Sequence, residues 1–201
     1  MCVVTAGRDA PAATLDRIGA AARAGADLIQ IREPQLSSRD LFDLTRRAVD
    51  GVRGTIARVL VNERADIAIA AGAAGVHLRG DSVAASRVRA IVAEGFVIGR
   101  SVHSVREARD ADEDGGCDFV LFGTVFQSAG KPRGHRVAGI DELRLVSAAV
   151  RLPVLAIGGV IVDRVAEVAA AGAAGIAAIG LFDDVASIAA TIARVRSRFD
   201  T

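Results

Sequence analysis

The sequence contains little lysine and few aromatic residues. Lys131 is the only lysine, against 24 arginines, and tryptophan and tyrosine are absent. The seven phenylalanines are too few to predict stacking platforms for single-stranded nucleic acid. Because the formal net charge is only +1 and no basic block occurs, we do not expect the chain to bind a nucleic-acid backbone.

Cysteine and long apolar segments are also scarce. Cys2 and Cys117 form neither a disulfide framework nor a metal-ligand spacing, which favours a reducing cytoplasm. No uncharged apolar run reaches the roughly 18 residues of a membrane span, and the N-terminus lacks the basic start and apolar core of a signal peptide. With 51% hydrophobic and 24% charged residues, the composition is that of a globular domain. We therefore expect a cytoplasmic protein with neither a membrane nor a nucleic-acid partner.

A glycine-rich phrase followed by an apolar run recurs four times along the chain. The four copies are residues 24–32, 71–78, 115–123 and 171–180. Glycine readily ends a helix in the left-handed conformation, and an uninterrupted apolar run is typical of a parallel strand covered on both faces. The phrase therefore predicts the passage from the end of a helix into a buried parallel strand.

Further apolar runs raise the number of predicted strands to eight. They are residues 3–5, 28–31, 59–61, 75–78, 97–99, 119–122, 154–157 and 176–179. A helical pattern follows each run, and Ser37 and Ser104 begin capping boxes. Eight units in 201 residues mean about 25 residues per unit, which suffices for a (β/α)8 barrel. We predict one α/β domain over residues 1–201, a (β/α)8 TIM barrel, because an open doubly wound sheet usually needs only about five or six units.

In such a barrel, the reacting groups lie at the carboxyl ends of the strands. Polar residues close or follow most of the predicted strands: Gln30, Arg32, Glu33, Asn62, Glu63, His77, Arg79, Asp81, Arg100, Ser101, His103 and Thr124. The opposite ends are mostly alanine, glycine and aspartate. We therefore place the candidate site at this polar rim.

Glycines follow the last two predicted strands. Gly158-Gly159 and Gly180 stand where barrels often bind phosphate through backbone N–H groups, and a simple turn is the alternative. Lys131, in the glycine-containing loop 127–135, is a second candidate ligand of phosphate or pyrophosphate, since a flexible ammonium suits that role. The alternative for Lys131 is an ordinary surface lysine.

Gln30 and Arg32 are expected on the same face of their strand because side chains alternate. An arginine buried in the barrel mouth needs a carboxylate partner, such as Glu63 or Asp81, or an anionic ligand, and the two can coexist. Asn62, Glu63 and Asp81 could hold Mg²⁺ through oxygen ligands together with the phosphates of a substrate. Structural roles for the carboxylates are the alternative.

Two of the three histidines are candidates for acid–base chemistry, because imidazole titrates near neutral pH. His103 lies between a predicted strand and the helix cap at Ser104, so it should face the mouth. His77 lies within a strand, where a packed structural histidine is the competing interpretation. His135 falls in the loop with Lys131 and is expected to be solvated.

Seven segments, in order along the chain, together resemble the thiamine phosphate synthase and TenI superfamily. They are residues 30–33, 61–66, 75–78, 98–104, 122–126, Lys131 and residues 156–159. The resemblance implies a (β/α)8 barrel, often a homodimer, that binds a thiazole or thiamine phosphate in thiamine biosynthesis. It implies a phosphate site at Gly158, Gly159, Ile179 and Gly180, and further substrate contacts at Gln30, Arg32, Asn62, His77, Ser101 and Lys131.

The superfamily has two enzymatic branches. The synthase joins a pyrimidine pyrophosphate to thiazole phosphate and needs Mg²⁺, for which the resemblance offers Glu63 and Asp81. Four positions depart from the synthase pattern: Pro34 replaces a lysine, Glu63 and Ser82 replace metal-binding aspartates, and Gly180 replaces a serine. Residues 127–130 replace a threonine-rich loop, whereas Lys131 is retained.

The TenI branch is closer in residues 98–104 and 119–123. Its thiazole tautomerase shifts a proton without a metal or other cofactor, and its proposed acid–base histidine corresponds to Thr124. Our preferred hypothesis is a TenI-like tautomerase or a close variant, in which His103 would take over the proton transfer and Arg32 would bind the substrate carboxylate. A Mg²⁺-dependent synthase is the alternative. A non-catalytic module that binds a thiamine-pathway phosphate is the third interpretation.

Overall fold

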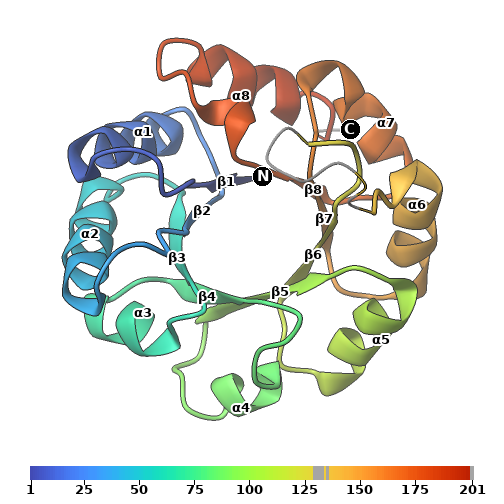
Figure 1. Ribbon diagram of the computed structural model, residues 1–201, viewed down its shortest axis with the longest axis horizontal. Helices are drawn as coiled ribbons and strands as arrows, with labels where there is room; N and C mark the ends of the chain where they lie inside the picture. The colour runs from blue at the N-terminus through green and yellow to red at the C-terminus, as the bar shows by residue number, and fades with distance from the viewer. Residues whose placement is uncertain (129–133, 135, 200–201) are drawn as a thin grey trace.

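The predicted apolar runs form eight parallel strands that close into a barrel (Figure 1). The computed structural model describes residues 1–128, 134 and 136–199. The strands are β1 (Cys2–Val4), β2 (Leu28–Ile31), β3 (Arg58–Asn62), β4 (Gly75–Leu78), β5 (Val97–Val102), β6 (Phe119–Gly123), β7 (Val154–Ile157) and β8 (Gly175–Ala178). They follow one another in chain order, and β1 closes the barrel by pairing with both β2 and β8. The predicted (β/α)8 TIM barrel is confirmed.

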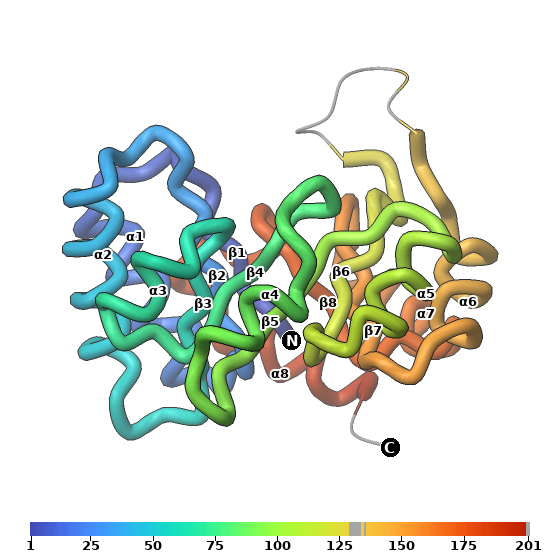
Figure 2. The backbone as a smooth tube through the Cα atoms, turned by 90° about the horizontal axis from the view of Figure 1, so that it is seen from below, coloured from blue at the N-terminus to red at the C-terminus, as the bar shows by residue number. Residues whose placement is uncertain are grey.

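Helices surround the barrel and alternate with its strands (Figures 1 and 2). They are α1 (Pro11–Arg23), α2 (Ser38–Gly51), α3 (Ala65–Ala71), α4 (Ala85–Arg89), α5 (Val105–Asp114), α6 (Gly139–Ala149), α7 (Val165–Ala170), α8 (Ile188–Arg196) and the 3₁₀ helices η1 (Val162–Arg164) and η2 (Gly180–Phe182). The hydroxyl oxygens of Ser37 and Ser104 each accept a hydrogen bond of 3.2 Å from the backbone N–H three residues later, so both predicted caps are confirmed. Gly72 and Gly115 end α3 and α5 at φ 72° and 68°, as the repeated glycine phrase predicts.

The continuous apolar runs reflect strands that are buried on both faces. Alternate strand residues form a cluster inside the barrel: Cys2, Val4, Leu60, Val97, Phe119, Leu121, Leu155 and Ala177. The intervening residues, such as Val3, Ile29 and Val61, join the larger cluster between strands and helices. These apolar side chains fill the barrel interior, and the polar side chains lie at the carboxyl ends of the strands.

Strand β5 extends further than predicted. It continues past Gly99 to Val102, so Arg100 and Ser101 lie within the strand and not beyond it. Gly99 does not interrupt the strand because the ring of Phe119 and the imidazole of His77 fill the space that a side chain at position 99 would occupy. By alternation, Ser101 points into the barrel and Arg100 points outward.

Within the described residues, no helix is both long and apolar enough to cross a membrane.

Candidate active site

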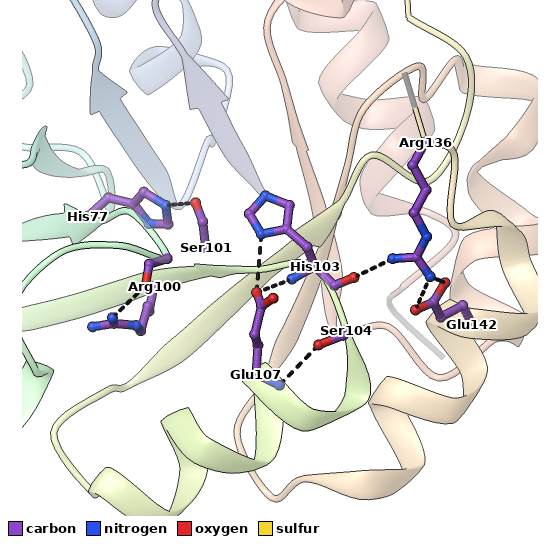
Figure 3. A network of polar contacts seen from close by, with 9 residues as sticks. His77, Arg100, Ser101, His103, Ser104, Glu107, Arg136 and Glu142 are labelled. Carbon is purple, nitrogen blue, oxygen red and sulfur yellow. Dashed lines mark hydrogen bonds and ion pairs between the residues drawn. The ribbon is translucent and has the colours of Figure 1, made fainter. Parts of the chain in front are cut away.

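Four uncharged polar side chains meet inside the barrel on the adjacent strands β2 to β5. The Gln30 amide nitrogen donates to Asn62 Oδ1 at 2.9 Å, and His77 Nε2 lies 2.8 Å from the Ser101 hydroxyl oxygen (Figure 3). Asn62 and His77 are register partners of β3 and β4, so the two pairs form one row, which we call the polar band. All four residues were predicted as substrate contacts, and the structure brings them together.

His77 is a buried, neutral member of the polar band. Only 2% of the residue is exposed, and burial lowers the pKa of His77 to about 3 because the cation loses its hydration. Nδ1 has no hydrogen-bond partner among the described residues. An unpaired buried acceptor is less unusual than an unpaired N–H, so we assign the ring proton to Nε2, which then donates to Ser101. The Ser101 hydroxyl proton is thereby left to donate to a ligand.

Arg32 lies differently from the prediction. Its side chain is exposed, and no carboxylate in the described part of the chain pairs with it. Strand β2 ends at Ile31, so the alternation that would turn Arg32 inward does not continue. The backbone N–H of Arg32 donates to the hydroxyl of buried Thr5 at 2.9 Å. The guanidinium is therefore a rim cation whose donors are available to an anion.

The predicted metal ligands Glu63 and Asp81 have separate partners. Glu63 Oε1 accepts hydrogen bonds from the Arg79 backbone N–H at 2.6 Å and from the Ser82 hydroxyl at 2.5 Å. Asp81 forms an exposed ion pair with the Arg79 guanidinium at 2.7 Å. Among the residues that the structure describes, no three His, Cys, Asp or Glu side chains are grouped as a metal site.

The geometry of Glu63 decides which kind of metal site the chain can form. Glu63 is the one non-glycine residue with positive φ, 67°, in the described ranges, a conformation that costs energy and often marks functional sites. Its second carboxylate oxygen, Oε2, has no hydrogen-bond partner in those ranges. The residues therefore fit a Mg²⁺ ion that Glu63 shares with the phosphates of a ligand, and they do not fit an ion enclosed by the protein.

His103 lies on the rim directly after β5, as predicted. Its side chain is 57% exposed, and the Glu107 carboxylate accepts from its backbone N–H at 2.8 Å and faces Nδ1 at 3.2 Å. Figure 3 shows the other ring nitrogen pointing away from Glu107. Arg136 donates to the His103 carbonyl at 3.1 Å and binds both carboxylate oxygens of Glu142. These contacts hold the turn in place and leave Nε2 of His103 without a partner among the described residues.

Gly158 and Gly159, predicted to bind phosphate, have structural reasons to be glycine. Their φ angles of 100° and 63° belong to a region that glycine adopts readily. A side chain at Gly158 would overlap Thr124, and one at Gly159 would overlap the backbone carbonyls of Phe126 and Gln127. The close approach of the segment after β6 therefore accounts for both glycines, whether or not their N–H groups bind a ligand.

Gly180 has no such packing requirement. Its φ lies outside the left-handed region, and the nearest described atom to an added Cβ would be Asp183 Oδ2, at an ordinary 3.6 Å. The N–H groups of Gly180 and Leu181 donate to no described atom, as is usual at the first turn of a helix. Ile179, the preceding candidate, packs partly against the barrel interior. The start of η2 is therefore open to a ligand.

Thr124, the predicted catalytic position after β6, is almost fully buried. Its backbone carbonyl accepts from the Ala138 N–H at 2.9 Å, which closes the base of the loop between β6 and α6. Lys131 and His135 lie outside the described residues, so the phosphate role of Lys131 stays a prediction.

Sequence reasoning missed two residues that shape the rim. Thr5, which ties β1 to the end of β2, is the polar residue that closes the first predicted strand, and the rule applied to the other strands would have found it. Nothing in the sequence indicated that Arg17 is buried, because a polar residue in an alanine-rich helix is ordinarily expected to face solvent. The structure buries it instead.

Residues 1–182 match the TMP-TENI family model, described as thiamine monophosphate synthase. A thiamine-phosphate synthase of Methanoculleus marisnigri is 38% identical over 96% of this chain and 90% of its own length. One of Chlorobium luteolum is 37% identical over 89% of this chain and 82% of its own. The structure of a thiamine phosphate pyrophosphorylase from Pyrococcus furiosus superposes with a TM-score of 0.83 at 29% identity, covering 99% of this chain and 94% of that one. These names support the synthase alternative better than our preferred tautomerase hypothesis. The chain belongs to the thiamine monophosphate synthase (TMP-TENI) family.

Proposed function

We propose that the protein is a thiamine-phosphate synthase, which joins a pyrimidine pyrophosphate to a thiazole phosphate and releases pyrophosphate. The polar band carries this proposal. Its amide, imidazole and hydroxyl groups are neutral donors and acceptors, which suit a neutral pyrimidine ring better than an anion. The synthase names of relatives at 37% and 38% identity support the same activity.

The proposed reaction is a substitution at the carbon attached to the pyrimidine ring. The bond between this carbon and a pyrophosphate oxygen breaks, and its electron pair leaves with the pyrophosphate. The lone pair of the thiazole nitrogen forms the new carbon–nitrogen bond. No proton is transferred in this step, so the site needs no general base. Thr124 at the position of the tautomerase histidine is compatible with this chemistry.

Four groups at the barrel mouth have a role in this proposal: the polar band, Arg32, the start of η2 and Glu63. The polar band would hold the pyrimidine ring and direct its reactive carbon toward the thiazole. The unpaired guanidinium of Arg32 would bind the pyrophosphate, and the open N–H groups of Gly180 and Leu181 would receive the thiazole phosphate. Mg²⁺, when held by Glu63 and the pyrophosphate, supplies positive charge that stabilises the leaving group.

The test is release of pyrophosphate, which should require both substrates and Mg²⁺. Arg32→Ala should lower kcat/KM by about tenfold to a hundredfold, because a hydrogen bond to a charged group contributes roughly 1.5–3 kcal/mol. Arg53→Ala is the matched control and should leave the rate unchanged, since Arg53 is an exposed arginine after α2 that pairs with Asp50 of that helix. The absence of pyrophosphate release at high enzyme concentration would reject the synthase.

A thiazole tautomerase is the second candidate, and the pair of His103 and Glu107 favours it. A carboxylate beside one imidazole nitrogen leaves the other nitrogen to act as acid or base. With this activity, the protein should accelerate aromatisation of the thiazole phosphate carboxylate. His103→Gln should abolish that acceleration and leave pyrophosphate release unchanged. Aromatisation at the uncatalysed rate rejects this candidate, and ligand binding without turnover of either substrate favours the non-catalytic module.

A further inference from the structure

Arg17 is a buried arginine outside the polar band. Its side chain on α1 is 10% exposed, and arginine is almost never buried without a partner for its charge. The guanidinium lies 2.5 Å from Asp9 Oδ2 and 3.7 Å from Asp183 Oδ1. Asp9 belongs to the loop between β1 and α1, and Asp183 directly follows η2. Arg17 therefore links the two rim loops at the seam where β1 meets β8.

Asp183 stands beside the proposed phosphate position. Its Oδ2 would lie 3.6 Å from a Cβ built on Gly180, next to the open start of η2. A carboxylate can accept hydrogen bonds from the free N–H groups at the start of a helix, and its charge repels a phosphate dianion nearby. An unrestrained Asp183 would therefore compete with the phosphate of a ligand.

We propose that Arg17 is a positioning residue for phosphate binding: its pairing with the Asp183 carboxylate offsets the negative charge of Asp183 and restrains that carboxylate from accepting hydrogen bonds from the N–H groups of Gly180 and Leu181. The inference rests on the proposed function, which puts the thiazole phosphate at η2. In this role Arg17 acts through Asp183 and does not touch the ligand.

Asp9 sets the strength of this restraint. It lies closer to the guanidinium than Asp183 does, at 2.5 Å against 3.7 Å, so the two carboxylates share one cation. Because Arg17 is buried, its interactions with both are screened less by water and salt than those of a surface pair. Removing the charge of Asp9 should leave Arg17 to act on Asp183 alone.

The first test measures dissociation constants by calorimetry for thiazole phosphate, the unphosphorylated thiazole alcohol and the pyrimidine pyrophosphate. Arg17→Met should weaken binding of thiazole phosphate by about tenfold, a coupling typical of residues in one charged network, and leave the other two affinities unchanged. Adding Asp183→Asn to Arg17→Met should restore the affinity, because the competing charge is gone. Equal losses for all three ligands, or no restoration by Asp183→Asn, would overturn the proposal.

A second variant keeps the test valid if Arg17→Met does not fold. Asp9 is partly exposed, with a third of its side chain accessible, and Asp9→Asn removes only a charge. This variant should bind thiazole phosphate severalfold more tightly than the wild type, and an unchanged or weaker affinity would contradict the proposal. Arg194→Met is the matched control, because Arg194 is an exposed arginine of α8 that pairs with Asp163, and it should change none of the affinities.

The wild-type protein separates this inference from the proposed function. If the wild type does not bind thiazole phosphate, the proposed function fails and the inference fails with it. If the wild type binds thiazole phosphate and all the variants bind it equally well, the inference alone is overturned.

Discussion

At the scale of single residues, neutral polar side chains and charged side chains occupy two separate zones of the barrel mouth. The polar band is uncharged, because three of its members carry amide or hydroxyl groups and burial keeps the fourth, His77, neutral. The charged groups stand around it on the rim, where Arg32 is exposed and Glu63 is partly exposed. A ligand with a neutral ring and a charged phosphate group would match this division.

Ser82 offers a residue-scale test of the Mg²⁺ site. Its hydroxyl donates to Glu63 Oε1, so Ser82→Asp would place a second carboxylate beside Glu63. The two like charges should destabilise the protein without metal and bind Mg²⁺ together. We expect Mg²⁺ to raise the Tm of Ser82→Asp more than that of the wild type, and calorimetry in the presence of pyrophosphate to show tighter Mg²⁺ binding.

Asp81→Asn is the control for that experiment. The Asp81 carboxylate is exposed and paired with Arg79, so its removal should leave the affinity for Mg²⁺ unchanged. A large loss of Mg²⁺ affinity in Asp81→Asn would show that the carboxylate leaves Arg79 to bind the metal, as the sequence predicted.

At the scale of elements, β5 organises the site from both of its faces. Ser101 points inward to the polar band, whereas the guanidinium of Arg100 points outward and donates to three carbonyls of the loop between β4 and α4. These are the carbonyls of Gly80, Ser82 and Val83, at 2.8, 3.1 and 2.9 Å. A cavity of about 210 Å³ adjoins Arg100 on the outer side of the strand. Arg100 is therefore the main polar anchor of the loop that carries Ser82.

Arg100→Met should loosen this loop while the barrel stays folded. Loss of three hydrogen bonds to one cation should increase hydrogen exchange of the amides of residues 79–84 by more than tenfold, since each such bond contributes roughly 1.5 kcal/mol or more. Arg100→Lys should restore only part of the protection, because an ammonium does not reproduce the planar fork. Arg106→Met, at a side chain that is 91% exposed, is the control and should leave exchange unchanged. Equal exchange in Arg100→Met and the wild type would show that the loop is held by other contacts.

At the scale of the whole molecule, the barrel was predictable because its requirements repeat. Each buried parallel strand needs a continuous apolar run, and each helix needs a start and an end, so eight similar units left eight similar patterns. The rule that sites lie at the carboxyl ends of strands then selected Gln30, Asn62, His77 and Ser101 correctly as neighbours. The hydrogen bonds between them were not predictable, because they cross from one strand to the next.

The errors have local physical causes. Arg32 was expected to point inward, but alternation holds only while a strand continues, and β2 ends one residue earlier. Gly99 was expected to end β5, but Phe119 packs into the space it leaves. Glu63 and Asp81 have separate partners, Ser82 and Arg79, and their role as metal ligands stays a prediction. At Gly99, a contact with a residue distant in the sequence decided the outcome.

The stability of the whole barrel should depend on pH through His77. Burial lowers the pKa of His77 from 6.5 to about 3, so between these values the unfolded chain binds a proton that the folded protein excludes. The free energy of unfolding should therefore fall as pH decreases below about 6.5, by up to about 1.4 kcal/mol per pH unit from this residue. Urea unfolding at pH 7.5, 6.0 and 5.0 should show this component in the wild type and in Ser101→Ala, which keeps the imidazole. His77→Gln should lack this component. The free energy of unfolding of the wild type should therefore decrease relative to that of His77→Gln as the pH decreases. A constant difference between the two proteins across this range would mean that His77 accepts a proton without unfolding.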